Sequence, residues 1–124
     1  MAFCTVINCI DGRVQLPVIK YLRARFDVKY VDSITEPGPV AILCQHRDHA
    51  RAEWIKEKVT ISINRHNSST LAVVAHFDCA GNPVSQARQI EQLHRAVATL
   101  KDTFPGKEVI GLWVGEDWKV QEIC

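Results

Sequence analysis

Two short segments of the sequence carry residue types that can bind a metal ion and handle a proton. The first segment contains Cys9, Asp11 and Arg13, and the second contains His76 and Cys79. Two thiolates and one imidazole suit Zn²⁺, and three protein ligands leave a fourth tetrahedral position for water or substrate. These residues therefore predict an open, catalytic zinc site. The alternative interpretation is two core thiols and an ordinary hydrogen-bonded histidine.

Asp11 and Arg13 are expected to control the fourth position on the metal. Because two thiolates neutralise Zn²⁺, water bound there is acidified less than in all-histidine sites. A carboxylate on the zinc would exclude the water nucleophile, whereas Arg13 can hold Asp11 bidentately and prevent this. Asp11 is thus predicted to be an inhibitory fourth ligand or an acceptor that orients the nucleophile, with higher pH favouring the second state. A plain salt bridge or turn-closing pair is the alternative.

The residues around Cys79 carry two further expectations. Asn82 followed by Pro83 is typical of a helix start, with the asparagine as the cap. The dipoles of a helix beginning so close to Cys79 would favour its thiolate. Asp78 is interpreted either as an acceptor for a group of the metal site or as a loop aspartate that satisfies its own backbone.

Apolar runs of strand length alternate along the chain with helical patterns, which is typical of an α/β domain with a mainly parallel sheet. The state of residues 40–44 stays open between helix and strand, and residues 118–124 add an edge strand or dock on a partner. The expected strands cover residues 3–10, 28–34, 70–75 and 109–114, and the expected helices cover residues 14–25, 48–64 and 82 to just before Pro105.

The two chemically active segments follow the first and third expected strands. Open parallel sheets bind ligands at the carboxyl ends of their strands, where the strand order reverses. We predict a three-layer fold with about four strands in the order 2-1-3-4, flanked by helices on both faces. This order places the two segments on either side of the switch point, so that they face each other.

The length and charge of the chain predict how many domains it has and which partners it lacks. The 124 residues, 14.0 kDa in mass, predict one domain over residues 1–124. Fifteen basic and fourteen acidic residues, evenly spread, argue against a nucleic-acid partner. The lack of a membrane-length apolar stretch and of a basic secretory leader predicts a cytoplasmic protein without membrane partners. Five cysteines in a reducing compartment are then core thiols or metal ligands.

A further group of metal-binding residue types lies just before and at the start of the helix expected over residues 48–64. Cys44, His46 and His49 are close together in the sequence. A second metal site is one interpretation, but a solvated helix start is favoured, because Asp48 is a typical helix cap.

The pattern Cys9-x-Asp11-x-Arg13, followed by His76-x-x-Cys79, resembles that of the β-class carbonic anhydrases, of which this chain looks like a short, divergent member. The resemblance covers most of the chain, since the order of strands and helices also fits, while its specificity lies in these residues. It implies zinc bound by Cys9, His76 and Cys79, the Asp11–Arg13 dyad beside the metal, and a homodimer or higher homo-oligomer.

Three features depart from the pattern of that family. Only eight residues precede Cys9, where the family commonly has a helical arm and a glutamine that helps to bind bicarbonate. The segment 36–38, Glu-Pro-Gly, replaces an Arg-Asn-Ala-Gly-like segment, and Ala80 stands where a glycine usually follows the second cysteine. These departures concern the dimer mode, the substrate pocket and the turnover.

The resemblance implies an enzyme, a zinc lyase that interconverts carbon dioxide and bicarbonate by attack of zinc-bound hydroxide on the carbon. A related hydrolase of carbonyl sulfide or carbon disulfide is the enzymatic alternative. The non-catalytic alternative is a family member with a closed zinc site, in which Asp11 is the permanent fourth ligand.

Overall fold

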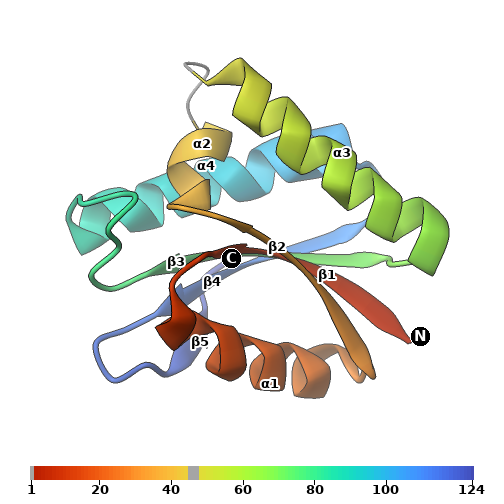
Figure 1. Cartoon of the computed structure of the whole chain (residues 1–124), viewed down its shortest axis with the longest axis horizontal. Coiled ribbons are helices and arrows are strands. Elements are labelled where there is room, and N and C mark those ends of the chain that lie inside the picture. The colour runs from red at the N-terminus through yellow and green to blue at the C-terminus, as the bar shows by residue number, and fades with distance from the viewer. Residues whose placement is uncertain (1, 45–47) are drawn as a thin grey trace.

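The computed structural model describes residues 2–44 and 48–124, in which strands and helices alternate (Figure 1). The strands are β1 (Phe3–Cys9), β2 (Tyr30–Glu36), β3 (Thr70–His76), β4 (Glu108–Val114) and β5 (Val120–Glu122). The helices are α1 (Gln15–Phe26), α2 (Pro39–Cys44), α3 (His49–His66) and α4 (Gln86–Thr103), and a 3₁₀ turn, η1 (Gly12–Val14), precedes α1.

One sheet contains the five strands of the described residues, in the order β2-β1-β3-β4-β5. The first four are parallel, and β5 pairs antiparallel with β4. This confirms the predicted order 2-1-3-4 and the additional edge strand from the C-terminal tail. The parallel register brings the carboxyl ends of β1 and β3 side by side, because Thr5 pairs with Leu71 and Ile7 pairs with Val73.

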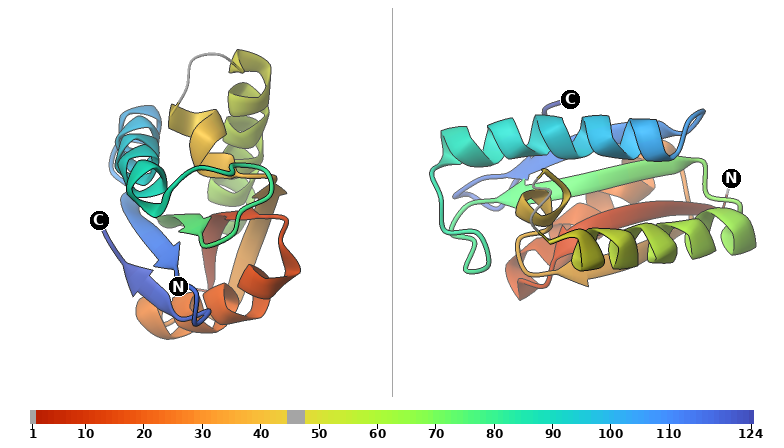
Figure 2. Two further views of the ribbon diagram at one scale, coloured as in Figure 1. Left: turned by 90° about the vertical axis from the view of Figure 1, so that its left-hand side faces the viewer. Right: turned by 90° about the horizontal axis from the view of Figure 1, so that it is seen from above.

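Helices cover both faces of the sheet and form the three expected layers. α1 packs on one face, while α2, α3 and α4 cover the other, with α2 between the ends of α3 and α4 (Figure 2). Two apolar clusters fill the spaces between these layers. β3 is buried along its whole length, as expected for a central parallel strand covered on both sides.

The bounds predicted for the second strand were wrong at both ends. β2 begins at Tyr30 rather than Val28 and continues through Thr35 and Glu36, beyond the predicted end at residue 34. β2 is an edge strand whose residues are mostly exposed or half-buried, so polar residues are tolerated in it and the apolar run ends before the pairing does. Residues 40–44, whose state the sequence left open, belong to helix α2.

The start predicted for the last helix was also wrong. α4 begins at Gln86, and its cap is Ser85, whose hydroxyl accepts a hydrogen bond from the amide of Arg88. Asn82 is instead buried, and its side-chain amide donates to Gln92 Oε1 at 2.7 Å. A tertiary contact therefore replaces the local cap that the sequence indicated. In the described part of the chain, no helix has the length and apolar character needed to cross a membrane.

Candidate metal centre

Three potential metal ligands converge where β1 and β3 end, and we call them the Cys–His–Cys cluster (Cys9, His76 and Cys79). Cys9 is the last residue of β1, His76 is the last residue of β3, and Cys79 lies in the loop that follows. The ligand atoms all lie within 4.8 Å of one another, and the two sulfurs are 3.9 Å apart. Two thiolates that are each about 2.3 Å from a tetrahedral zinc lie roughly 3.8 Å apart, so this spacing fits one ion.

The imidazole of His76 is oriented to offer one nitrogen as a ligand. Its Nδ1 lies 2.7 Å from the carbonyl oxygen of Phe77, a contact that places the proton on Nδ1. Nε2 then keeps a free lone pair, and within the described residues it has no hydrogen-bond partner although the side chain is buried. An unpaired buried nitrogen is unfavourable, so this atom also fits a site that binds an ion.

The two cysteines of the cluster have opposite tendencies to ionise in the metal-free protein. The Cys79 thiol can donate a hydrogen bond to the Cys9 sulfur, which lowers the pKa of Cys9 and raises that of Cys79. Hydrogen bonds from the backbone amides of Gly81 and Asn82 act in the opposite direction on the pKa of Cys79. The expected helix dipole is not the cause, because α4 begins only at Gln86.

Two glycines let the loops beside the cluster touch through their backbones. Gly38, in the β2–α2 loop, has a φ of +58°, and a Cβ there would lie 2.7 Å from the Cβ of Asn82. A Cβ on Gly81 would lie 2.6 Å from the backbone carbon of Pro37. The same contact brings the amide of Gly38 to Cys9, where its hydrogen bond lowers the pKa of the thiol. Both positions therefore require glycine to bring the loops this close.

Side-chain amides hold the backbone of both ligand segments in place. Gln15 Nε2 donates to the carbonyl oxygens of Cys9 and Asp11 at 2.6 and 3.0 Å. Gln89, which is buried on α4, donates from Nε2 to the carbonyl oxygen of His76 at 2.9 Å. Each of these two segments is thus tied to the helix that packs beside it, which limits the movement of the candidate ligands.

The carboxylate of Asp11 is bound by Arg13 on both oxygens. Arg13 Nη2 donates to Oδ2 at 2.7 Å, and Nε donates to Oδ1 at 3.0 Å. The backbone amide of Arg13 donates to Oδ1 at 2.9 Å. The hydrogen bonds from Arg13 lower the pKa of Asp11 to about 2, so this carboxyl is charged at neutral pH. Asp11 does not belong to the group of ligand atoms formed by the Cys–His–Cys cluster.

The guanidinium of Arg13 has two further neighbours. Nη1 donates to Asp78 Oδ2 at 3.3 Å, and Nη2 donates to the carbonyl oxygen of Asp78 at 3.2 Å. The ring of Trp118 lies 4.4 Å from the central carbon of the guanidinium. Asp78, whose role the sequence left open, therefore contacts the dyad. The contact with Trp118 was missed, because no local pattern relates residues so far apart along the chain.

The other cysteines and histidines form no second centre among the described residues, where the Cys–His–Cys cluster is the one group of three candidate ligands. The Cys44 thiol contacts the carbonyl oxygen of Ala41 at 3.6 Å. His49 opens α3, whose cap is Asp48, as the favoured interpretation of a helix start predicted. His46 lies outside the described residues.

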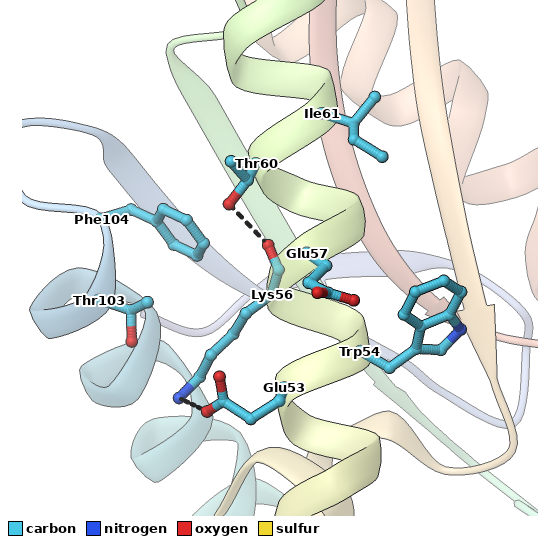
Figure 3. A pocket seen from close by; sticks show the side chains of 8 residues that line it. All are labelled: Glu53, Trp54, Lys56, Glu57, Thr60, Ile61, Thr103 and Phe104. Atoms are coloured by element: carbon cyan, nitrogen blue, oxygen red, sulfur yellow. Dashed lines mark hydrogen bonds and ion pairs between the residues drawn. The ribbon is translucent and has the colours of Figure 1, made fainter.

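A surface hollow of about 660 Å³ lies elsewhere, along α3 and beside the C-terminal end of α4 (Figure 3). Within it, Lys56 Nζ lies 3.4 Å from Glu53 Oε1, and the Thr60 hydroxyl donates to the carbonyl oxygen of Lys56. None of its described lining residues is a cysteine or a histidine. Its lining residues are Glu53, Trp54, Lys56, Glu57, Thr60, Ile61, Thr103 and Phe104.

Solved structures with a similar fold include β-carbonic anhydrases. The isoform I enzyme of the protozoan Trichomonas vaginalis has 13% sequence identity and a TM-score of 0.61, over 96% of this chain and 81% of that one. A tetrameric enzyme of the ascomycete Sordaria macrospora has 11% identity and a TM-score of 0.59, over 99% and 81%. An enzyme of Aspergillus fumigatus has 11% identity and a TM-score of 0.52, over 97% and 74%. At these identities the likeness shows the fold alone.

Sequence comparison defines the relationship more directly. A search of curated protein sequences found no match to this chain. A family model described as "Putative carbonic anhydrase" matches residues 1–124, the whole of the sequence. Since the match extends over every element that positions the Cys–His–Cys cluster, the chain belongs to the carbonic anhydrase family.

Proposed function

We propose that the protein is a zinc-dependent carbonic anhydrase that interconverts carbon dioxide and bicarbonate. The observation that carries this proposal is the Cys–His–Cys cluster, whose ligand atoms lie within 4.8 Å of one another in a member of the carbonic anhydrase family. The unpaired Nε2 of His76 supports it further, because this atom needs a partner that the described residues do not supply. Membership of the family supports hydration of carbon dioxide in general.

Each residue of the site has a separate role in this proposal. Cys9, His76 and Cys79 would hold the zinc, which when bound would act as a Lewis acid and lower the pKa of a bound water, though less strongly than in an all-histidine site. Asp11 orients that water by accepting a hydrogen bond from it. Arg13 fixes the Asp11 carboxylate through two parallel hydrogen bonds and keeps it charged.

The pairing of Asp11 with Arg13 favours an open site over a closed one. A closed, non-catalytic site requires an oxygen of Asp11 as the fourth ligand. In this structure both oxygens accept hydrogen bonds from Arg13, and neither joins the group of ligand atoms. A vacant fourth position is what a catalytic zinc needs, whereas structural zinc sites have four protein ligands.

We also infer that the protein acts as a homo-oligomer. Four apolar side chains near the carboxyl edge of the sheet are more exposed than is usual for their type: Ile10 at 58%, Leu16 at 59%, Phe77 at 40% and Val84 at 40%. A second copy of the chain would remove these surfaces from water. The similar enzymes of Sordaria macrospora are described as tetrameric, which is consistent with this arrangement.

Stopped-flow hydration of carbon dioxide tests the proposal. The full-length protein, loaded with one zinc per chain, is compared with Cys79→Ser from about pH 7 to about pH 9. We expect a zinc-dependent rate in the unmodified protein and loss of both zinc and rate in the variant. Cys44→Ser is the matched control, because its side chain lies on α2 and contacts only the carbonyl oxygen of Ala41 among the hydrogen bonds described.

Two results would contradict the proposal. A zinc-loaded protein with no rate above that of buffer at any pH would favour the closed, non-catalytic site. A protein that hydrolyses carbonyl sulfide or carbon disulfide without hydrating carbon dioxide would favour the hydrolase instead.

A further inference from the structure

The tight turn between β4 and β5 directs the indole of Trp118 toward the dyad. Gly115 accepts a hydrogen bond from the amide of Trp118 at 2.9 Å, and its own amide donates to the carbonyl oxygen of Lys119 at 3.3 Å. Asp117 Oδ1 accepts from the amide of Lys119 at 3.0 Å. These bonds close the turn on both sides of Trp118 and fix its backbone, and the centroid of its ring lies 4.4 Å from the central carbon of the Arg13 guanidinium.

The backbone of Trp118 has a positive φ, a conformation that is unfavourable for residues other than glycine. In the described part of the chain, four residues other than glycine have positive φ. Asp27 and Asn67 end helices α1 and α3, where this conformation is common. The remaining two, Asp78 and Trp118, have φ of 56° and 59°, and both contact Arg13. For a residue as bulky as tryptophan this conformation is a real outlier.

We propose that Trp118 is a positioning residue, whose ring stacks on the guanidinium of Arg13 and thereby keeps that arginine bound to Asp11. This inference rests on the proposed function, in which Arg13 must hold the Asp11 carboxylate away from the fourth zinc position. It assigns a role to the C-terminal hairpin, which supplies none of the proposed ligands and neither member of the dyad.

The need for such a residue follows from the exposure of Arg13. Its side chain is 46% exposed, and a long, solvated side chain loses rotamer freedom when it is held in one place. Hydrogen bonds to Asp11 and Asp78 act in the plane of the guanidinium, so they leave its faces free. A ring packed on one face restrains the remaining movement, and the attraction between cation and π-system favours that arrangement.

The same ring also connects the dyad to the ligand strand. Its centroid lies 6.3 Å from that of Phe77, in an edge-to-face arrangement, and 6.5 Å from that of His76. Aromatic pairs at these distances attract each other. Trp118 is thereby held from the side of β3 while it contacts Arg13, so the orientation of the dyad depends on the position of the hairpin.

Nuclear magnetic resonance of the full-length protein, as purified, tests the stacking directly. In the unmodified protein, the Nε–H proton of Arg13 should show a ring-current shift and slow exchange with water. In Trp118→Leu, the shift should vanish and exchange should become about tenfold faster. Trp118→Phe keeps an aromatic face and should retain most of the protection. Trp54→Leu is the matched control, because Trp54 stacks with Lys58 at 5.3 Å on α3 and contacts none of the dyad.

Kinetics of the zinc-loaded variants tests what the stacking does. If Trp118 acts through Arg13, Trp118→Leu should lower kcat for carbon dioxide by about tenfold with little change in KM, because fewer molecules have an open site. Trp118→Phe should restore most of kcat. A raised KM with unchanged kcat would overturn the proposal, because it would place the ring against the substrate.

The magnetic resonance experiment tests the stacking of Trp118 on Arg13 independently of the proposed carbonic anhydrase activity. If Arg13 in the unmodified protein shows no ring-current shift, or if Trp118→Leu leaves its exchange unchanged, the proposal is wrong whatever the activity. If the protein lacks zinc or activity but Arg13 shows the shift and its loss, the stacking stands and the proposed function fails. Unchanged amide signals of β5 in each variant show that the hairpin remains folded.

Discussion

The two edges of the central sheet each hold a cluster of polar side chains, and the two clusters differ in how their polar atoms are paired. The carboxyl edge holds the Cys–His–Cys cluster. The amino edge holds what we call the hydroxyl network, formed by Thr5, Asp32, Ser62, His66 and Ser68. Ser62 donates to Asp32 Oδ2 at 2.7 Å, and His66 Nδ1 lies 2.6 Å from the same oxygen. Thr5 lies 2.6 Å from the Ser62 hydroxyl and donates to Ser68 at 2.7 Å.

The comparison shows which kind of polar cluster indicates a ligand. The hydroxyl network combines serine, aspartate and histidine, yet each of its members is bonded to another member. At the carboxyl edge, His76 Nε2 has no hydrogen-bond partner among the described residues and lies beside two sulfurs. Within the part of the chain that the structure describes, Thr70 Oγ1 at the amino edge also lacks a partner, but it is a single hydroxyl and belongs to no group of candidate ligand atoms. Residue types alone would suggest chemistry at both edges. Only the carboxyl edge combines an unpaired buried nitrogen with other candidate ligand atoms, and this combination suggests a metal site there.

The largest expected effect is the loss of metal from the carboxyl edge. Cys9→Ser removes a thiolate from a three-ligand set, so zinc content should fall from about one ion per chain to almost none, with activity lost in parallel. Elemental analysis and carbon dioxide hydration measure the two quantities. If this variant kept one zinc per chain, the claim that the carboxyl edge binds the metal through Cys9 would be wrong.

A smaller effect is expected when the dyad is broken and the ligands are kept. Arg13→Ala frees Asp11 to move, and the misplaced carboxylate should lower kcat by about 100-fold while zinc content stays near one per chain. Arg95→Ala is the matched control, because that side chain pairs with Glu91 on the outer face of α4. An Arg13→Ala variant with normal turnover would leave the dyad without a function.

At the amino edge, a substitution should change stability and leave the chemistry intact. Ser62→Ala deprives Asp32 of a donor and Thr5 of a buried partner, which should lower the free energy of unfolding by about 1–3 kcal/mol. Urea unfolding of the zinc-loaded protein measures this change. Ser33→Ala, at an exposed position of β2, should change the value by less than about 0.5 kcal/mol. Loss of zinc on replacing Ser62 would argue that the two edges are coupled.

The smallest effect is expected at the outer end of the hydroxyl network. The side chains of His66 and Asp32 are 43% and 26% exposed, so solvent screens their pairing. His66→Gln should therefore lower the free energy of unfolding by less than about 1 kcal/mol, with unchanged kinetics. A larger loss, measured by the same urea unfolding, would show that the pairing of His66 with Asp32 contributes to the stability of the whole hydroxyl network.

The sequence predicted those parts of the fold whose signals are local. β1, β3 and β4 are apolar because they are buried on both faces, and their ends placed the ligand segments correctly beside each other. The predicted bounds of β2 were displaced by two residues because an edge strand tolerates polar residues at its end. The start of α4 was wrong because Asn82 forms a tertiary hydrogen bond with Gln92 instead of a cap.

The candidate site was predictable to a similar extent. The convergence of Cys9, His76 and Cys79, the candidate ligands, and the proximity of Asp11 and Arg13 could be inferred from spacing at strand ends. The contacts of Gly38 with Gly81 and of Trp118 with Arg13 could not, because they depend on how separate loops meet once the sheet has formed. Long-range contacts of this kind leave no periodic pattern in the sequence.

X-ray absorption at the zinc edge tests the central claim most directly, because it counts the sulfurs bound to the metal. For protein purified without chelators, we predict two sulfurs at about 2.3 Å and two lighter atoms at about 2.0–2.1 Å. A shell without sulfur, or with more than two sulfurs, would contradict the assignment of Cys9, His76 and Cys79 as the ligands.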